Sequence, residues 1–175
     1  MQILVTGAAG FIGSNFVEYM VKKYPNYKIV VLDKLTYAGN IHNLDNVIDK
    51  ITFIKGDICD VELVTKTFKD YNINAVVHFA AESHVDNSIK NPFVFTKTNV
   101  IGTHTLLEVA KQIWGEASKN KFVHISTDEV YGALGNNGYF SENSPINPSS
   151  PYSASKASSD LIAFAYYHTF NMNVT

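Results

Sequence analysis

Three glycines at three-residue spacing lie near the start of the chain, directly after a short apolar run. The run is Ile3-Leu4-Val5, and an apolar-periodic segment follows Gly7, Gly10 and Gly13. This order predicts a strand, a tight turn and a helix. The first glycine permits the turn, the second lets the backbone approach a pyrophosphate, and the third lets the helix pack closely on the strand. Because N–H groups and the helix dipole favour negative charge at a helix start, the turn is a candidate phosphate site.

A glycine triplet also occurs in ordinary turns, so the surrounding residues decide its interpretation. A second apolar run, 28–32, ends at Asp33, which lies 20 residues beyond Gly13. An NAD-binding unit places at this distance the carboxylate that holds the adenosine ribose hydroxyls. We therefore expect a cofactor-binding βαβ unit, with a phosphate-free βαβ unit as the alternative. The first helix should contribute these residues to the core: Phe11, Phe16, Val17 and Met20.

Composition limits both the size and the partners of the chain. Its 175 residues predict one domain, 1–175, and the net charge of −2 without a long basic run argues against a nucleic-acid partner. All 14 basic residues are lysines, so the chain lacks the planar fork that best grips a 2′-phosphate. This absence favours NAD over NADP. Cys59 is the only cysteine, which excludes an internal disulfide.

Apolar strand-like runs alternate with helix-like segments along the whole chain. We expect further strands at 51–55, 75–79 and 121–125, helices at about 60–70, 92–114 and 151–170, and a weaker helical segment at 41–48. This alternation predicts an α/β fold, a doubly wound parallel sheet of the Rossmann type. Asp57 is either the N-cap of helix 60–70 or an acceptor for the adenine amino group, or both.

The two ends of the chain carry separate expectations. The apolar N-terminus is too short for a signal or membrane segment, so we expect a cytoplasmic protein without a membrane partner. Residues 172–175 look like the opening of a sixth strand. We therefore expect a chain truncated before a substrate-binding C-terminal part.

Ligands of an open parallel sheet bind beyond the carboxyl ends of its strands, which makes the helix pair Tyr152 and Lys156 a candidate catalytic site. The spacing Tyr-x-x-x-Lys places both side chains on one helix face, where the ammonium should lower the pKa of the phenol. Such a tyrosine can take a proton from a sugar hydroxyl. The pair at 19 and 23 has the same spacing, and only position after the fifth strand selects Tyr152.

Two adjacent carboxyl groups, Asp128 and Glu129, follow Thr127 after the fifth strand. Hydride transfer alone needs one base and one orienting hydroxyl, so this pair suggests an additional acid and base for eliminating water. The alternative is a solvated loop whose acids cap a turn. The histidines are expected in core or hydrogen-bonded roles, and their spacing suggests no metal site.

Four segments together resemble the extended short-chain dehydrogenase/reductases and, more narrowly, the dTDP-glucose 4,6-dehydratases. They are Thr6-Gly-Ala-Ala-Gly-Phe-Ile-Gly13, Phe79-Ala-Ala-Glu-Ser-His-Val-Asp86, Ser126-Thr-Asp-Glu-Val-Tyr-Gly132 and Tyr152-Ser-Ala-Ser-Lys156. The resemblance implies that Tyr152 helps to oxidise glucose at carbon 4 and that Lys156 holds the cofactor and tunes Tyr152. It further implies that Thr127 orients the carbon 4 hydroxyl, Glu129 removes the carbon 5 proton, and Asp128 protonates the departing carbon 6 hydroxyl.

The resemblance also implies NAD as the cofactor, a nucleotide sugar as the substrate, and a homodimer formed through helices 92–114 and 151–170. Ser83, Thr127, Asp128 and Glu129 would contact the substrate. The residues expected around NAD are Gly7, Gly10, Phe11, Ile12, Gly13, Asp33, Lys34, Asp57, Ile58, Ala80, Ala81, Tyr152 and Lys156. Two alternatives stay open: a sugar-nucleotide 4-epimerase, and a module that binds NAD without catalysis.

Overall fold

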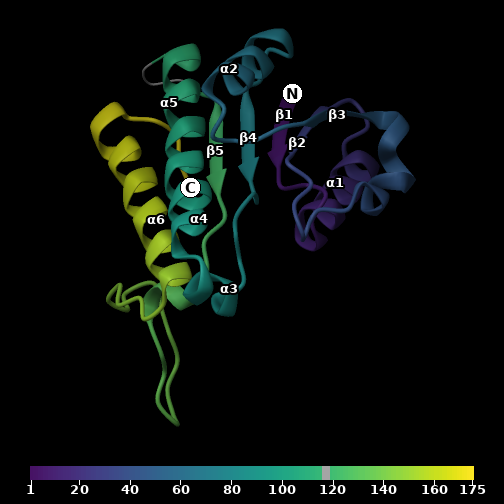
Figure 1. The fold of residues 1–175 in the computed structure, drawn as a ribbon. Coiled ribbons are helices and arrows are strands. Elements are labelled where there is room, and N and C mark those ends of the chain that lie inside the picture. Colours follow the sequence, from purple (N-terminus) through teal and green to yellow (C-terminus); the bar gives the residue numbers. More distant parts are fainter. Residues whose placement is uncertain (116–118) are drawn as a thin grey trace.

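Residues 1–115 and 119–175 are described by the structure, a computed structural model, and within them five strands form one parallel sheet (Figure 1). The strands are β1 (Gln2–Thr6), β2 (Lys28–Asp33), β3 (Ile51–Lys55), β4 (Ala75–His78) and β5 (Lys121–His124). Their order is β3-β2-β1-β4-β5, and every neighbouring pair is parallel. Because the order turns back between β1 and β4, the predicted doubly wound sheet is confirmed.

Helices cover both faces of this sheet. The elements are α1 (Phe11–Lys23), η1 (Ile41–Lys50), α2 (Val61–Asp70), α3 (Val85–Lys90), α4 (Pro92–Phe95), η2 (Thr96–Gly102), α5 (Thr103–Trp114), η3 (Asp128–Tyr131) and α6 (Pro151–Phe170). One apolar core joins the sheet to α2, α5 and α6, and a second joins it to α1 and η1. Figure 1 shows α5 and α6 side by side, with α1 on the far side of the strands.

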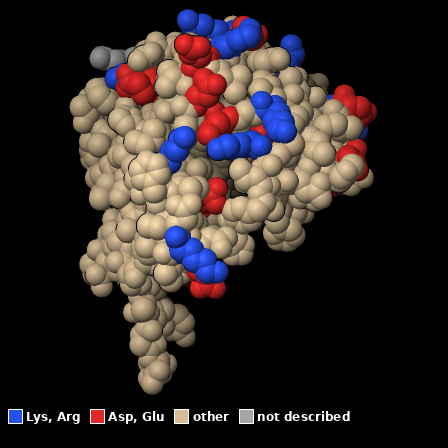
Figure 2. Space-filling view, viewed as in Figure 1, with Lys and Arg blue, Asp and Glu red and all other residues tan. Residues whose placement is uncertain are grey.

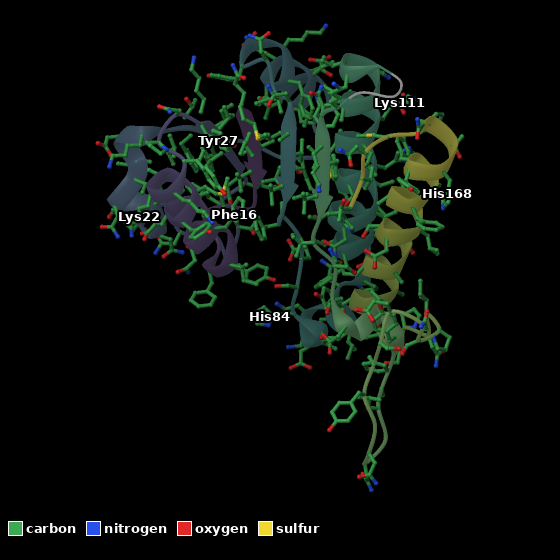
Figure 3. All side chains as sticks on the ribbon, turned by 180° about the vertical axis from the view of Figure 1, so that it is seen from behind. Phe16, Lys22, Tyr27, His84, Lys111 and His168 are labelled. Carbon is green, nitrogen blue, oxygen red and sulfur yellow. The ribbon has the colours of Figure 1, made fainter. Side chains whose placement is uncertain are left out.

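The alternation of side chains along β1 assigns its residues to the two cores. Leu4 packs with the core of α2, α5 and α6, whereas Ile3 and Val5 pack with that of α1 and η1. All three side chains are buried, as expected for a central parallel strand that helices cover on both faces. In Figure 3, Phe16 of α1 lies toward the sheet and Lys22 lies on the outside of the helix.

One predicted core residue is wrong: the Phe11 side chain is 82% exposed. Phe11 is the first residue of α1, where the helix starts beyond the strand ends, so its ring lies past the edge of the sheet. It lines a cavity there instead of the core. Val17 is buried as expected, and Phe16 and Met20 pack against the same core.

The predicted helix 92–114 is interrupted, and a short helix before it was not predicted. Its middle is a π-helix, η2, between α4 and α5, and α3 precedes it. Gly102 lies in this segment against Ile58, where a Cβ would approach the Ile58 side chain to 2.4 Å. Single π-turns within longer helices are common near functional sites.

The predicted sixth strand begins as expected beside β5. The Phe122 N–H donates to the Asn173 carbonyl at 2.9 Å, and the Thr175 N–H donates to the Phe122 carbonyl at 2.9 Å. Phe122 and Val174 form a parallel bridge. Residues 172–175 therefore extend the sheet at its β5 edge.

The polar loop of residues 132–150 extends from the body of the molecule as a long narrow protrusion (Figure 1). The Asn147 N–H donates to the Val130 carbonyl at 3.0 Å and closes the base of the loop. Among the described residues, no helix combines the length and apolarity needed to cross a membrane.

Candidate active site at the carboxyl ends of the strands

A cavity of about 400 Å³ lies at the carboxyl ends of the strands, beside the glycine turn. Figure 2 shows the surface hollowed in this region, with lysine and carboxylate side chains near the hollow. Every residue that the sequence suggested for cofactor binding, together with Ser83, lines this cavity. The fold thus brings together five segments that are far apart in the sequence, although their binding roles stay predictions.

The glycine turn is crowded in a way that only glycine permits. Gly7 has a φ of +69°, and a Cβ there would lie 2.5 Å from the Ala80 amide nitrogen. A Cβ on Gly13 would lie 2.5 Å from the Gly7 carbonyl oxygen, which explains the close packing of α1 on the turn. The backbone of the turn is therefore held against the exit of β4.

Asp33 at the end of β2 is buried and tied to the glycine turn. One carboxylate oxygen accepts from the Ala9 N–H at 2.9 Å, and the other accepts from the Leu35 N–H at 2.8 Å. Each carboxylate oxygen can accept a second hydrogen bond. The side chain is thus rigidly oriented and retains acceptor capacity toward the cavity that it lines.

Lys34 and Asp57 form an ion pair, with 2.8 Å between the ammonium nitrogen and a carboxylate oxygen. Burial raises the pKa of Asp57, but the hydrogen bonds from Lys34 and from the Cys59 N–H outweigh it and hold this pKa below its ordinary value. The predicted N-cap role of Asp57 is wrong. Asp60 caps α2 instead and accepts from the Leu63 N–H at 3.0 Å, because the chain makes one more turn after Asp57.

Tyr152 and Lys156 lie in the first turns of α6, and both side chains line the cavity. The expected lowering of the Tyr152 pKa is wrong for this structure. Burial raises this pKa, and so do the carboxylates of residues 128, 129 and 160, whereas a hydrogen bond with Thr127 lowers it. Lys156 donates to the Ile125 carbonyl at 2.6 Å, and burial lowers its pKa to about 8. The Lys156 ammonium is therefore hydrogen-bonded to the residue that follows β5, and burial is the largest influence on the pKa of the Tyr152 phenol.

The carboxyl pair lies just outside the residues that line the cavity. Asp128 and Glu129 open the short helix η3, and Glu129 donates its N–H to the Thr127 hydroxyl at 3.3 Å. The cap of this turn is thus the Thr127 side chain and not the two acids. Both carboxylates lie close enough to Tyr152 to raise the pKa of its phenol.

Sequence reasoning did not select Thr98, a polar residue of the cavity wall. Thr98 belongs to the π-helical segment, whose approach to the cavity no local pattern indicates. The neighbouring Asn99 carries a detectable signal, a polar residue in an apolar-periodic helix. Its side chain accepts from the Glu82 N–H at 2.8 Å and donates to the Ser155 hydroxyl at 2.9 Å, which joins β4, η2 and α6.

The buried histidine His78 joins strands and helices, as the sequence suggested. Its Nδ1 lies 2.6 Å from the Thr6 hydroxyl and its Nε2 lies 2.9 Å from the Thr103 hydroxyl. Thr103 donates its own proton to the Asn99 carbonyl, so it must accept from the Nε2–H of His78. Burial holds the pKa of His78 well below its ordinary value, which is consistent with a neutral ring.

A doubly wound parallel sheet with a glycine turn at a cavity beyond its strand ends defines a Rossmann-like domain. The family model described as GDP-mannose 4,6 dehydratase matches residues 4–175, and the chain belongs to this family.

Relatives within the family carry a narrower name. A probable dTDP-glucose 4,6-dehydratase of Sinorhizobium fredii is 49% identical over 99% of this chain and 51% of its own length. The crystal structure of dTDP-glucose 4,6-dehydratase from Streptomyces venezuelae with NAD bound superposes with a TM-score of 0.91 at 48% identity, over 99% of this chain and 54% of that one.

The epimerases are structurally similar but more distant in sequence. UDP-glucose 4-epimerase from Thermus thermophilus, also in complex with NAD, has a TM-score of 0.88 at 32% identity, over 99% of this chain and 53% of that one. The chain spans about half the length of the curated relatives it matches.

Proposed function

We propose that residues 1–175 are the NAD-binding and catalytic half of a dTDP-glucose 4,6-dehydratase. The observation that carries the proposal is the position of Asp128 and Glu129 beside Tyr152, which lines the same cavity as the glycine turn. The identity of about 49% to enzymes of that name supports it. A cytoplasmic location and a homodimer remain predictions.

The cavity residues fit an NAD molecule. The glycine turn lines the cavity at the start of α1, where the N–H groups of a helix suit a pyrophosphate. Asp33 would accept from the ribose hydroxyls, and its charge would repel a 2′-phosphate that no arginine of this chain can neutralise. When bound, NAD supplies the chemistry of taking a hydride from carbon 4 of the glucose and returning it to carbon 6.

The side chains divide the proton transfers among them. Tyr152, as a phenolate that Lys156 would stabilise, would take the proton of the carbon 4 hydroxyl, which Thr127 would orient, and would become the neutral phenol. Glu129 would remove the carbon 5 proton next to the new carbonyl group. Asp128 would protonate the carbon 6 hydroxyl as it leaves as water. Ser83 would add a substrate contact from the exit of β4.

The other candidate is a 4-epimerase, which the similarity to UDP-glucose 4-epimerases favours. Epimerisation needs Tyr152 and the cofactor but leaves no task for a second acid and base. An NAD-binding module without catalysis would need neither Tyr152 nor Lys156 at the cavity. We therefore favour dehydration over both.

Incubation of the protein in its full length with NAD and dTDP-glucose tests the proposal. We expect a 4-keto-6-deoxy sugar nucleotide, identified by mass spectrometry as the substrate less one water. Conversion of UDP-glucose to UDP-galactose without loss of mass would favour the epimerase instead. Tight binding of NAD without turnover of either sugar would favour the non-catalytic module.

A further inference from the structure

Three consecutive residues at the exit of β5 are each bonded to one face of α6. The Ile125 carbonyl accepts from Lys156 at 2.6 Å. On either side of it, His124 Nε2 lies 2.9 Å from the Asp160 carboxylate, and the Ser126 hydroxyl donates to the other oxygen of the same carboxylate. Because residues 156 and 160 are one helical turn apart, both side chains bind the end of β5 from a single face of α6. We call these contacts of Lys156 and Asp160 with residues 124–126 the clamp.

The chemistry of these groups fixes the direction of the hydrogen bonds. A carboxylate only accepts, so His124 must carry its proton on Nε2 and Ser126 must point its proton at Asp160. His124 Nδ1 is buried and has no hydrogen-bond partner among the described residues, which makes a doubly protonated ring costly. Burial also lowers the pKa of His124, against the hydrogen bond to Asp160. The ring is therefore a neutral donor, and the negative charge stays on Asp160.

The segment that follows this clamp carries the proposed acid and base. Ser126 is followed directly by Thr127, Asp128 and Glu129, and η3 is a helix of four residues. Such a short turn has little stability of its own, so its position depends on the residues that anchor it. On the α6 side, Asp160 anchors this segment through Ser126, beside the hydrogen bonds of Lys156 with Ile125 and of Tyr152 with Thr127.

We propose that Asp160 is a positioning residue of the active site, which sets the place of Thr127, Asp128 and Glu129 relative to Tyr152. This inference rests on the proposed dehydratase function. Asp160 does not line the cavity, and it acts through Ser126, His124 and Lys156.

The charge of Asp160 affects both members of the helix pair in one direction. The charge of Asp160 raises the pKa of Lys156, whereas burial lowers it. His78 of β4 and His124 of β5 also interact electrostatically with Lys156. Asp160 also raises the pKa of Tyr152, together with burial and with Asp128 and Glu129 of η3. Removal of this one charge should lower both pKa values. Lys156 would then lose its proton at a lower pH, and the Tyr152 phenolate would form at a lower pH.

Asp160→Asn tests the proposal, because asparagine keeps the shape and one acceptor but removes the charge. In the full-length protein we expect kcat to fall about 10- to 100-fold, as for a displaced catalytic group, with KM within about threefold. In the profile of kcat against pH, both the acid limb and the basic limb should move to lower pH. Glu108→Gln is the matched control, because it too removes the charge of a hydrogen-bonded carboxylate. Glu108 lies on α5 and contacts Tyr166 of α6 and Lys111 of α5 instead. It should leave the profile unchanged.

A second measurement does not depend on turnover. Competitive acetylation of amines over a pH range, resolved by mass spectrometry, gives the pKa of Lys156 in each folded variant. We expect about 8 in the unmodified protein and a value lower by about half a unit or more in Asp160→Asn. An unchanged Lys156 pKa and unchanged pH limbs would overturn the proposal. If the unmodified protein makes no keto sugar, the dehydratase function fails, and the labelling still decides the role of Asp160.

A pair of His124 variants decides the question if Asp160→Asn does not fold. Glutamine can place an N–H donor near the position of the ring Nε2, and leucine cannot. We expect His124→Gln to keep kcat within about threefold and His124→Leu to lose about tenfold or more. Equal kcat values in the two variants would contradict the clamp.

Discussion

At the scale of single residues, the proposed function assigns oxidation and elimination to different side chains. Tyr152→Phe should stop the reaction before any cofactor is reduced, because no base would take the carbon 4 proton. Asp128→Asn and Glu129→Gln should spare that step and slow the loss of water, by about 100- to 10,000-fold. Absorbance of reduced cofactor after addition of dTDP-glucose to the full-length protein separates the two classes. Unchanged turnover in a variant that combines Asp128→Asn with Glu129→Gln would leave the pair without a catalytic role.

The glycine turn allows a matched comparison between two residues with left-handed backbone. Gly7 and Gly115 have φ values of +69° and +73°, so a side chain is strained at either position. Gly7 is the crowded one of the two, since a Cβ on Gly115 would meet no atom of residues 1–115 and 119–175 within 4 Å. Gly7→Ala should therefore lower the free energy of unfolding well beyond Gly115→Ala and weaken NAD binding. Denaturant unfolding and NAD titration of both variants measure the difference. Equal losses of unfolding free energy in the two variants would contradict the crowding at Gly7.

At this scale, sequence analysis predicted the features that depend on residue spacing. It missed the features that depend on contacts between distant parts of the chain. The glycines, Asp33 and Ala80 lie at the cavity because each follows a strand that ends at the same edge of the sheet. The pKa of Tyr152 could not be predicted, because it depends on burial and on carboxylates that the fold brings near. Asp160 gave no signal at all, since its partners lie more than 30 residues away.

At the scale of elements, the start of α6 has a well-defined N-terminal cap. Ser150 and Ser153 form a capping box, with Pro151 at the first helical position. This cap fixes the first turn, in which Tyr152 lies. Ser150→Ala should lower the free energy of unfolding by about 1 kcal/mol.

Ser158→Ala is the control for the cap, because Ser158 is exposed in the middle of the same helix and donates only to the Ala154 carbonyl. We expect it to leave stability unchanged within about 0.5 kcal/mol. Urea unfolding of both variants provides the measurement. A Ser150→Ala variant as stable as Ser158→Ala would show that the cap adds nothing.

Element prediction succeeded where the pattern is periodic and failed where packing overrides it. All five strands were expected within one residue of their ends, because apolar runs between polar turns mark them. The π-helix η2 was not, since Gly102 accommodates Ile58 from a distant part of the chain. α3 was missed because its six residues lack an apolar period.

At the scale of the whole molecule, α6 presents an apolar surface that neither core uses. Leu161, Phe164 and Tyr167 are 56%, 62% and 48% exposed, although Tyr166 between them is buried. Phe164 also packs its ring edge on His168, which lies on the outer side of α6 (Figure 3). A contiguous exposed apolar surface of this kind is typical of an interface.

We expect this surface to form the predicted homodimer contact in the full-length protein. Phe164→Ser removes an exposed ring from its centre without touching the cavity, and should shift the protein from dimer to monomer at micromolar concentration. Tyr139→Ser is the matched control, because this ring is 96% exposed on the protruding loop and away from α6. Sedimentation of the three proteins measures the outcome. If the unmodified protein sediments as a monomer, the apolar surface of α6 is covered by another part of the molecule, and the variant should then lose stability instead of a partner.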